Sequence, residues 1–418
     1  MAPWNTVQAC VDLERLGGPA LMGALHRQEA RGEEIFSFEY EPSWLERPDV
    51  FSFDPDLALV PGPQYPAAGR GTFGLFMDSS PDRWGRVLMQ RREGMRARQE
   101  GRRPRGLSEW DFLLGVHDET RLGALRFRAA AGEPFIDSDG QLAAPPIASL
   151  AAIQEASLRF EQHLEDEGDP DEERWLSQLF APGTSLGGAR PKASVRDEAG
   201  VLCMAKFPSR KDTRDIGAWE LVANRLARLA GVEVPAAKPL RLPGSPHTTF
   251  VVRRFDRSPG GGRRAFVSAM TLTQRIDGET GGSYLELVDL LQSRGASTRA
   301  DCEQLFRRVV FSILVHNTDD HLRNHGFVIE REGLRLSPAY DINPTIGRDE
   351  LTLAINEVDT ACDVAIAIDA CQDYGLTQQA ATAVVRQVRT GVGEWRTQAT
   401  AVGIPRSEQE LMAPAFER

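Results

Sequence analysis

The chain has 418 residues, of which 41% are hydrophobic and 26% charged, a composition typical of ordinary globular proteins, which excludes the disordered and fibrous classes. At roughly 100 to 200 residues per domain, this length predicts two or three folding units. Lys and Arg number 49 against 60 Asp and Glu, and the resulting net charge of −11 excludes a protein that coats nucleic acid by bulk electrostatics.

The cysteines and the N-terminus indicate a cytoplasmic protein. The five cysteines are an odd number and form no CxxC pair, so neither a disulfide framework nor a zinc site is indicated. The first residues lack a basic segment followed by an apolar core, and no run approaches the roughly 18 apolar residues of a membrane span. We therefore expect no membrane contact.

The first part of the chain reads as strands interrupted by helices. Aromatic and β-branched residues predict strands over 33–40, 56–60 and 120–127. A helix is predicted to begin at Ser80-Pro81-Asp82, a plausible cap followed by an acidic first turn, and to end within the arginine-rich run that follows.

This run, residues 83–105, carries nine arginines against two acids, Glu93 and Glu100. A solvated helix and loop is the simpler interpretation. Contact with nucleic-acid phosphates is the alternative, because a protein this acidic needs a local patch or a partner chain to approach nucleic acid.

The middle of the chain changes from helix to hairpin. Residues 145–179 have a helical pattern with an acidic, loop-like interruption at 165–174. Two β-runs, 184–195 and 201–209, flank a turn at 197–200 and predict a hairpin. Further along, we expect a helix over 216–230 that stops at Gly231, then strands over 238–242 and 248–255.

From residue 258 onward the pattern is mainly helical. One hairpin is predicted over 325–341, with Glu332-Gly333 at its turn. The segment 375–395 has the spacing of a core helix, which we favour over a DNA-reading helix-turn-helix. The fold class is therefore α+β.

The strongest chemical pattern is HNTDDHLRN at 316–324, directly after the apolar helical stretch 305–315. Packing gives no reason for such a polar cluster at the end of a buried helix, so we interpret it as a site. Asp319 and Asn324 are five residues apart, and Asp341 follows the next hairpin. The same spacing occurs in the catalytic loop of protein kinases, which is followed by a metal-binding Asp.

The oxygen-rich set suits Mg²⁺, which binds through one or two carboxylates plus phosphate oxygens. Zinc is disfavoured because the HExxH spacing is absent around His321.

Upstream residues predict a phosphate-binding loop. Gly187 and Gly188 give flexible backbone whose amides can approach phosphate, although a simple tight turn is an equal alternative. Lys206, in the following strand, is placed like the strand lysine that contacts α- and β-phosphates, with Glu220 as a possible ion-pair partner.

Six sequence blocks, which occur in family order, resemble the HipA family of bacterial serine/threonine kinases, including the toxin kinases of type II toxin–antitoxin modules. The blocks are GVHDETRLGALRF at 115–127, SLGGARPKAS at 185–194, AKFPS at 205–209, VVRRFDR at 251–257, NTDDHLRNHGF at 317–327 and LSPAYDINP at 336–344.

The resemblance implies a role for each matching residue. Asp319 would activate the acceptor hydroxyl, and Asn324 and Asp341 would hold Mg²⁺. Ser185 matches a serine that can be autophosphorylated, with Thr184 beside it as a second candidate. The residues implied in nucleotide binding are Gly187, Gly188, Ala189, Lys192 and Lys206, then Arg253 and Phe255 in the hinge that meets adenine, and Asp256.

The same resemblance implies a HipA-like, protein-kinase-like fold in three parts. These are an N-terminal subdomain (1–130), a small lobe with phosphate loop and hinge (131–257) and a helical lobe (258–418). The implied activity is Mg²⁺/ATP-dependent phosphorylation of a protein hydroxyl, by a toxin that reaches DNA only through a HipB-like antitoxin. Two alternatives stay open: a nucleotide-binding corepressor that acts through such an antitoxin, and a small-molecule kinase that uses the same site.

Overall fold

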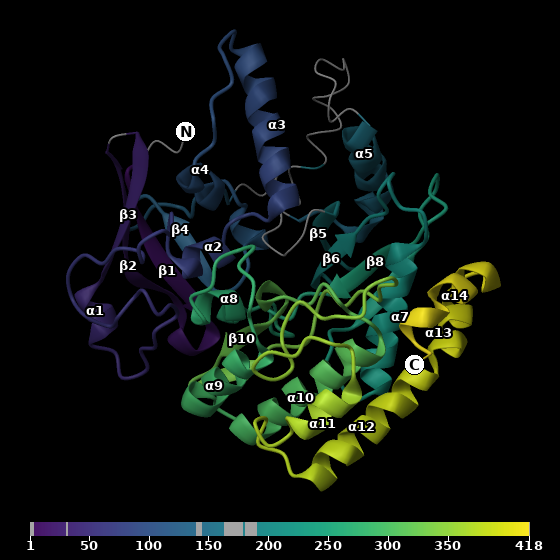
Figure 1. Ribbon diagram of the computed structural model, residues 1–418. Coiled ribbons are helices and arrows are strands. Elements are labelled where there is room, and N and C mark those ends of the chain that lie inside the picture. The colour runs from purple at the N-terminus through teal and green to yellow at the C-terminus, as the bar shows by residue number, and fades with distance from the viewer. Residues whose placement is uncertain (1–3, 31, 139–143, 163–178, 180–189, 418) are drawn as a thin grey trace. The chain divides into compact units, whose positions relative to one another are not determined.

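The computed structural model describes residues 4–30, 32–138, 144–162, 179 and 190–417, and Figure 1 shows its elements. The chain packs into two compact units. The first comprises Met1–Arg210 and Asp256–Val267, and the second comprises Lys211–Phe255 and Ser268–Arg418. The three-part division expected from the sequence stays a prediction.

The first unit is built on an antiparallel sheet in the order β3-β2-β1-β4. Its strands are β1 (Thr6–Leu13), β2 (Gly18–Ala30), β3 (Glu33–Tyr40) and β4 (Leu125–Arg128). Aromatic rings fill the core against this sheet: Phe76 packs on both Phe38 of β3 and Phe127 of β4, with ring centroids 5.7 and 6.0 Å away. β3 confirms the strand predicted over 33–40.

Among the described residues of this unit, the helices are short except for two. They are η1 (Glu14–Leu16), α1 (Pro42–Leu45), α2 (Gly74–Asp78), α3 (Arg83–Gln99), α4 (Glu109–Leu114), η2 (Asp118–Thr120), η4 (Ile147–Ser149) and α5 (Leu150–Gln162). The ring of Trp84 on α3 packs edge-on against Phe160 of α5 at 5.2 Å. The acidic interruption predicted at 165–174 lies outside the described residues.

Two predictions for this unit are wrong. Residues 56–60 form turns instead of a strand, because Asp54 engages the backbone here. Its carboxylate accepts the N–H groups of Asp56 and Leu75. Its backbone carbonyl accepts the N–H group of Leu57. In 120–127, only the end is strand, since η2 and a turn at Gly123 (φ 74°) occupy the beginning.

Helix α3 confirms the helix predicted to begin at the Ser80-Pro81-Asp82 segment. Asp82 caps the helix, accepting the Gly85 N–H at 2.7 Å. The helix then continues to Gln99 and ends within the arginine run of residues 83–105, as expected.

The predicted hairpin is confirmed as β5 (Lys192–Arg196) and β6 (Leu202–Lys206), which pair antiparallel. Its turn is fixed by the Asp197 carboxylate, which accepts the N–H groups of Ala199 and Val201. Gly200 adopts φ 79°, a conformation that glycine tolerates best.

The second unit is mainly helical. Its helices are α7 (Ile216–Leu229), α8 (Ala269–Leu272), α9 (Tyr284–Arg294), α10 (Thr298–Leu314), η5 (Leu322–Asn324), α11 (Val364–Asp369), α12 (Gln378–Gly393), α13 (Trp395–Val402), α14 (Arg406–Met412) and η6 (Ala413–Ala415). Its strands form two hairpins, β7 (Ala237–Leu240) with β8 (Thr249–Arg253), and β10 (Gly326–Ile329) with β11 (Leu334–Leu336). Strand β9 (Phe266–Ser268) crosses the boundary between the units along the chain.

Helix α12 contacts both α7 and α10 in the core of this unit. α7 begins at its Asp215 cap and ends before Gly231 (φ 77°), as predicted. A Cβ at Gly391 of α12 would lie 2.6 Å from Ala230 N, so glycine permits this close approach. The valines of α12 are buried, which confirms the core role predicted for 375–395.

The observed mixture of helix and sheet confirms the α+β class. No helix in the described part of the chain combines the length and apolar character that a membrane crossing requires.

Candidate active site

The site in the second unit begins where α10 ends. The Asn317 N–H bonds to the Ser312 carbonyl and His316 adopts φ 49°, so the chain leaves the buried helix in a sharp turn. The two aspartates that follow have opposite surroundings: Asp319 is exposed, whereas Asp320 is buried.

Asp320 lies at the centre of a buried hydrogen-bond network. Its carboxylate accepts the Tyr284 hydroxyl at 2.5 Å and lies 2.9 Å from His325 Nε2, and the Ser312 hydroxyl is 3.3 Å away. Burial raises the pKa of this carboxyl. The electrostatic attraction of His325 and the hydrogen bonds from His325 and Tyr284 outweigh that effect, so the pKa is lower than the usual value for Asp. The network holds the backbone directly after Asp319.

Asn324, at the end of η5, contacts the Asp319 residue directly. Its side-chain nitrogen donates to the Asp319 backbone carbonyl at 3.2 Å, and the side chain is otherwise buried. Because the nitrogen is used in this bond, Oδ1 is the atom suited to a cation. The structure therefore brings Asp319 and Asn324 together, as their spacing predicts.

Asp341 lies on the segment after β11. It adopts φ 58°, a strained conformation for a residue with a side chain, and Asn343 Nδ2 donates to its Oδ1 at 3.3 Å. Such strain persists where the surrounding contacts over-determine the backbone.

Those contacts join the Asp341 segment to the Asp319 loop. The Tyr340 hydroxyl donates to the Arg323 carbonyl at 2.9 Å, and the Asn343 N–H donates to Asn317 Oδ1 at 3.0 Å. Next along the chain, the Thr345 and Thr318 hydroxyls are 2.6 Å apart. Asp319, Asn324 and Asp341 thus belong to two loops of the second unit that several hydrogen bonds join together.

The predicted hinge reaches the same segment. The Phe255 ring stacks on Tyr340 at 5.3 Å with an interplanar angle of 23°. Arg253 is exposed at the end of β8, and its N–H bonds to the Ala236 carbonyl. The chain passes from the second unit to the first between Phe255 and Asp256.

Three predicted residues of the first unit that the structure describes, Lys192, Lys206 and Asp256, are buried. Lys192 and Lys206 are opposite each other in the register of β5 and β6. Lys192 Nζ lies 2.7 Å from Asp82 Oδ2, with both side chains almost completely buried. Asp256 accepts the Gly123 N–H at 2.9 Å and pairs with Arg257 at 2.6 Å. Their roles toward a nucleotide stay predictions.

Part of the predicted site cannot be placed. Ser185, Gly187, Gly188 and Ala189, together with Thr184, lie outside the described residues.

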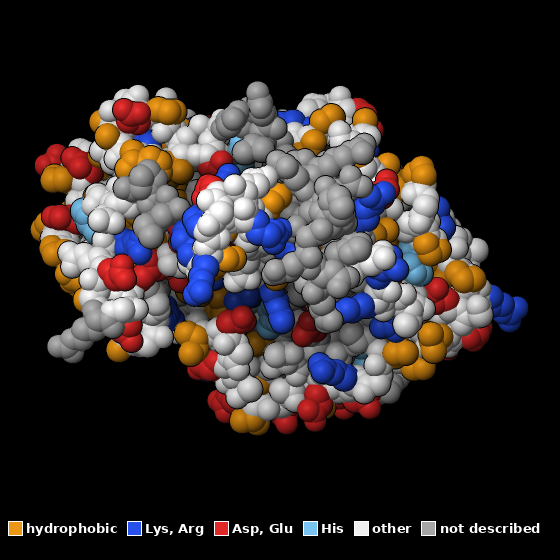
Figure 2. Space-filling model, turned by 90° about the horizontal axis from the view of Figure 1, so that it is seen from above, with side chains coloured by type: hydrophobic (Ala, Val, Ile, Leu, Met, Phe, Trp, Pro, Cys, Tyr) orange, Lys and Arg blue, Asp and Glu red, His pale blue; other side chains and the backbone are white. Residues whose placement is uncertain are grey.

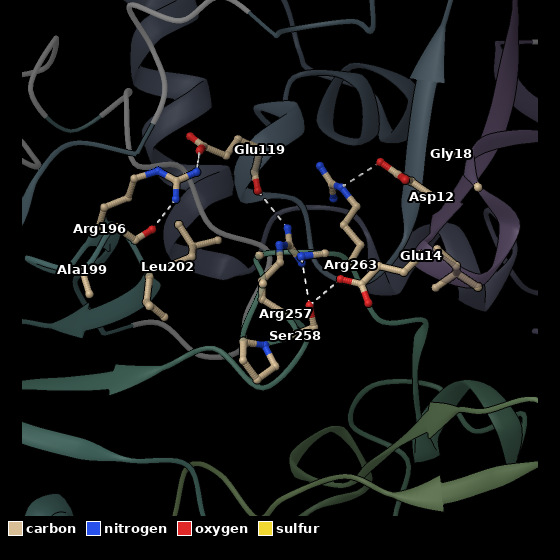
Figure 3. A pocket seen from close by; sticks show the side chains of 18 residues that line it. Asp12, Glu14, Gly18, Glu119, Arg196, Ala199, Leu202, Arg257, Ser258 and Arg263 are labelled. Atoms are coloured by element: carbon tan, nitrogen blue, oxygen red, sulfur yellow. Dashed lines mark hydrogen bonds and ion pairs between the residues drawn. The ribbon is translucent and has the colours of Figure 1, made fainter.

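The first unit also contains a cavity of about 680 Å³ between the end of β1, the β5–β6 turn and the loop at 257–263 (Figure 3). Its charged side chains are engaged with their neighbours: Arg196 pairs with Glu119, and Arg257 Nη2 donates to the Glu119 and Arg121 carbonyls. Of the described residues that line it, none is a predicted site residue.

The donor set fits Mg²⁺ bound together with a nucleotide. Asn324 and Asp341 offer oxygen ligands, and Mg²⁺ in phosphoryl-transfer sites takes only one or two such side chains alongside phosphate oxygens. Among the described residues, no group of three or more His, Cys, Asp or Glu side chains forms a self-contained metal site.

Sequence reasoning missed the residues that support the site. Tyr284 is 36 residues upstream of Asp320 and carries no local signal, and Tyr340 was only part of a matching block. His325 directly follows the polar cluster in the sequence, but its partner Asp320 is visible only in the fold.

Comparison with known proteins decides the family. Residues 184–395, half of the chain, match the family model of the HipA-like C-terminal domain. The chain belongs to the HipA family. The matched range includes Asp319, Asn324 and Asp341, so the site lies within the HipA-like region.

A solved HipA structure shows the same fold over the whole length. The HipA chain from the complex described as the "Shewanella oneidensis MR-1 Toxin Antitoxin System HipA, HipB and its operator DNA complex" superposes with a TM-score of 0.63 at 16% identity. The match covers 98% of this chain and 95% of that one, which confirms the HipA-like fold.

Curated relatives are similar over shorter stretches. The protein named "Putative kinase Y4dM" of Sinorhizobium fredii is 29% identical over 219 residues, which is 46% of this chain and 53% of that protein. "Putative kinase Y4mE" of the same organism is 25% identical over 158 residues, 36% of each chain. The chain therefore spans about half or less of the curated relatives it matches.

Proposed function

We propose that this HipA-family chain is a Mg²⁺/ATP-dependent serine/threonine protein kinase. The observation that supports the proposal is the pair of joined loops, which carry an exposed carboxylate, Asp319, together with Asn324 and Asp341, whose side-chain oxygens suit a cation. Phosphoryl transfer needs little covalent chemistry from the protein, so positioning and charge neutralisation account for most of its catalysis.

Each residue has a defined task in this scheme. Asp319 accepts a hydrogen bond from the acceptor hydroxyl and orients it toward the γ-phosphate. Asn324 Oδ1 and the Asp341 carboxylate would hold Mg²⁺, which neutralises charge on the phosphates. Asp320 does not meet substrate; its buried network fixes the Asp319 backbone.

The upstream residues complete the nucleotide site. Lys206 would contact the α- and β-phosphates, and the backbone at Arg253 to Phe255 would meet adenine. Ser185 would be the residue that the kinase phosphorylates on itself, which mass spectrometry of the purified chain after incubation with ATP detects directly.

The biological setting proposed is that of a type II toxin acting in the cytoplasm with a HipB-like, DNA-binding antitoxin. Support comes from the full-length fold match to a HipA that was solved with HipB and its operator DNA. The net charge of −11 agrees with contact to DNA mainly through such a partner.

The activity is tested by incubating the purified chain with γ-labelled ATP, Mg²⁺ and a bacterial lysate as the source of acceptor proteins. Asp319→Asn keeps the side-chain shape but removes the hydrogen-bond-accepting charge, and we expect label transfer to fall about 100- to 10,000-fold. The matched control is Asp289→Asn, an exposed carboxylate on α9, which keeps full activity. Equal transfer by wild type and Asp319→Asn overturns the proposal.

A further inference from the structure

One charged side chain in the interior of the second unit has no task in the proposed kinase chemistry. Charged groups are ordinarily found at the surface, and Figure 2 shows a face of the chain on which Lys, Arg, Asp and Glu side chains are exposed. Arg308, in contrast, lies on α10 (Figure 1) and is only 4% exposed. Arginine is almost never buried to this degree unless it is paired.

Arg308 makes fewer contacts than its charge requires. Its Nη2 donates to the buried Ser337 carbonyl, whereas Nε and Nη1 are buried and meet no acceptor among the described residues. Burial lowers the pKa of Arg308 to about 10, and the charges of Glu233 and Asp320 partly offset this effect without forming an ion pair with it. The guanidinium is therefore charged at neutral pH.

Stability alone does not explain this arginine. A buried charge without a counter-ion is costly, and a well-packed apolar side chain of similar volume often stabilises such a position. The neighbouring Arg307 has the partners that Arg308 lacks. It donates to the Ala230 carbonyl and to Gln387 Oε1, at 3.0 and 2.6 Å, and pairs with Glu303 at 3.1 Å.

The contact of Arg308 links α10 to the segment that leads to Asp341. Asp301, seven residues earlier on the same face of α10, binds the Arg335 guanidinium of β11 at 2.9 and 3.3 Å and accepts the N–H of the next residue at 3.2 Å. Arg308 then binds the carbonyl of Ser337, the residue that follows. One face of α10 therefore holds residues 335–337.

Asp341 needs a firmly held approach because its own backbone is strained. It adopts φ 58°, and such a conformation persists where the surrounding contacts over-determine the backbone. Ser337 lies four residues before it, and its N–H bonds to the Gly326 carbonyl at 2.9 Å. Arg308 fixes the other polar group of the same peptide segment with a charged donor, and such hydrogen bonds are stronger than neutral ones.

We propose that Arg308 is a positioning residue that holds Asp341 in place for Mg²⁺. It acts through the Ser337 carbonyl, because this bond fixes the backbone that leads to the ligand. The inference rests on the proposed function, in which Asp341 holds the ion. Replacing a group that orients a metal ligand from behind typically costs about 10- to 100-fold in metal affinity or activity.

The test uses the purified full chain with a non-hydrolysable ATP analogue at a fixed, saturating concentration. For each variant, the free Mg²⁺ concentration that gives half of the maximal rise in Tm is measured, and denaturant titration gives the stability. R308M replaces the charge by an unbranched apolar side chain, and R308K keeps a charged donor. The matched control is R307M, because Arg307 is also buried on α10 but binds other parts of the unit.

We expect R308M to need about 10- to 100-fold more Mg²⁺ for half of the shift. Its denaturant midpoint should stay close to that of wild type, because the lost hydrogen bond is offset by removal of a buried charge. R308K should lie between wild type and R308M in its Mg²⁺ requirement. R307M should lose stability and keep the wild-type requirement. In the Asp341→Asn background, R308M should change the requirement no further, since it acts through Asp341.

An unchanged Mg²⁺ requirement in R308M, or equal changes in R308M and R307M, overturns the proposal. If R308M does not fold, a wild-type requirement in R308K overturns it. Label transfer from γ-labelled ATP by the wild type is measured in parallel. Transfer together with an unchanged requirement in R308M counts against Arg308 alone, whereas a wild type that shows neither transfer nor a Mg²⁺-dependent shift overturns the kinase proposal and this inference together.

Discussion

At the scale of residues, the site depends on two neighbouring aspartates with opposite tasks. Asp319 is exposed and Asp320 is buried against Tyr284 and His325. The sequence shows two identical carboxylates in a row, and both suit the pattern of a catalytic loop. Asp319 was singled out by its spacing to Asn324, while the task of Asp320 became visible only when Tyr284, distant in the sequence, was found beside it.

Replacing Asp320 should therefore destabilise the fold, whereas replacing Asp319 should not. Asp320→Ala leaves Tyr284 and His325 without their buried partner, and we expect a loss of about 3 to 5 kcal/mol in the free energy of unfolding. Asp319→Ala should change stability by less than about 0.5 kcal/mol, because its side chain is exposed. Denaturant titration of both variants checks the difference, and equal stabilities would contradict the buried network.

The same carboxyl predicts a dependence on pH. Because its pKa is lowered in the folded chain, its contribution to stability is complete above the ordinary Asp value of about 3.9 and is lost as pH falls below it. Wild type should thus lose more stability than Asp320→Ala as the pH falls below about 4. Tyr284 supports the network as a donor, since burial beside Asp320 raises the pKa of its hydroxyl well above the usual value.

At the scale of elements, a buried ion pair joins α3 to β5. Lys192 lies 2.7 Å from Asp82, which also caps α3. The family resemblance assigns Lys192 to nucleotide binding, and the ion pair adds a structural task. Unfolding free energy reports on the structural role, and the KM for ATP reports on the role in nucleotide binding.

Lys192→Met should cost about 3 to 5 kcal/mol of unfolding free energy, because it leaves the Asp82 carboxylate buried without its cation. Adding Asp82→Asn should recover part of that loss, since asparagine keeps the cap acceptor and removes the charge. A double-mutant cycle by denaturant titration measures the coupling. If the KM for ATP rises in the double variant, Lys192 also has a role in nucleotide binding. If the KM is unchanged and the cycle shows a strong coupling energy between Lys192 and Asp82, the role of Lys192 is the ion pair alone.

Elements with local signals were predictable, and those set by distant contacts were not. The Asp215 cap and Gly231 stop of α7, and the Asp197 turn of the hairpin, are encoded within a few residues. The strand expected at 56–60 failed because one buried carboxylate, Asp54, captured the backbone N–H groups. The α3 helix was predicted to run into the arginine-rich segment, but the bond from Arg102, beyond the helix end, to Glu93 within it was not visible in the sequence.

At the scale of the whole molecule, the predicted kinase residues divide between the two units. Lys192, Lys206 and Asp256 belong to the first, and the Asp319 site belongs to the second. The predicted hinge lies where the chain passes from one unit to the other, after Phe255. Sequence blocks identified the family and the order of its parts. The phosphate-binding loop and the autophosphorylation at Ser185, which fall in residues 180–189 outside the described part of the chain, stay predictions.

Nucleotide binding by the whole chain should appear as thermal stabilisation. A ligand at 100 times its Kd adds about 2.7 kcal/mol to the free energy of unfolding, so ATP with Mg²⁺ should raise Tm measurably. Asn324→Ala and Asp341→Ala should lose the part of this shift that depends on Mg²⁺, while Asp289→Asn keeps it. The same Mg²⁺-dependent shift in all variants would contradict the assignment of these ligands.

The central claim is that the joined loops around Asp319, Asn324 and Asp341 transfer phosphate to proteins. The most direct measurement compares the phosphoproteome of bacteria after brief expression of the wild-type chain and of Asp341→Ala at matched abundance. The account predicts a small set of phosphoserine or phosphothreonine sites present only with the wild-type chain. Identical phosphoproteomes from the two chains would contradict it.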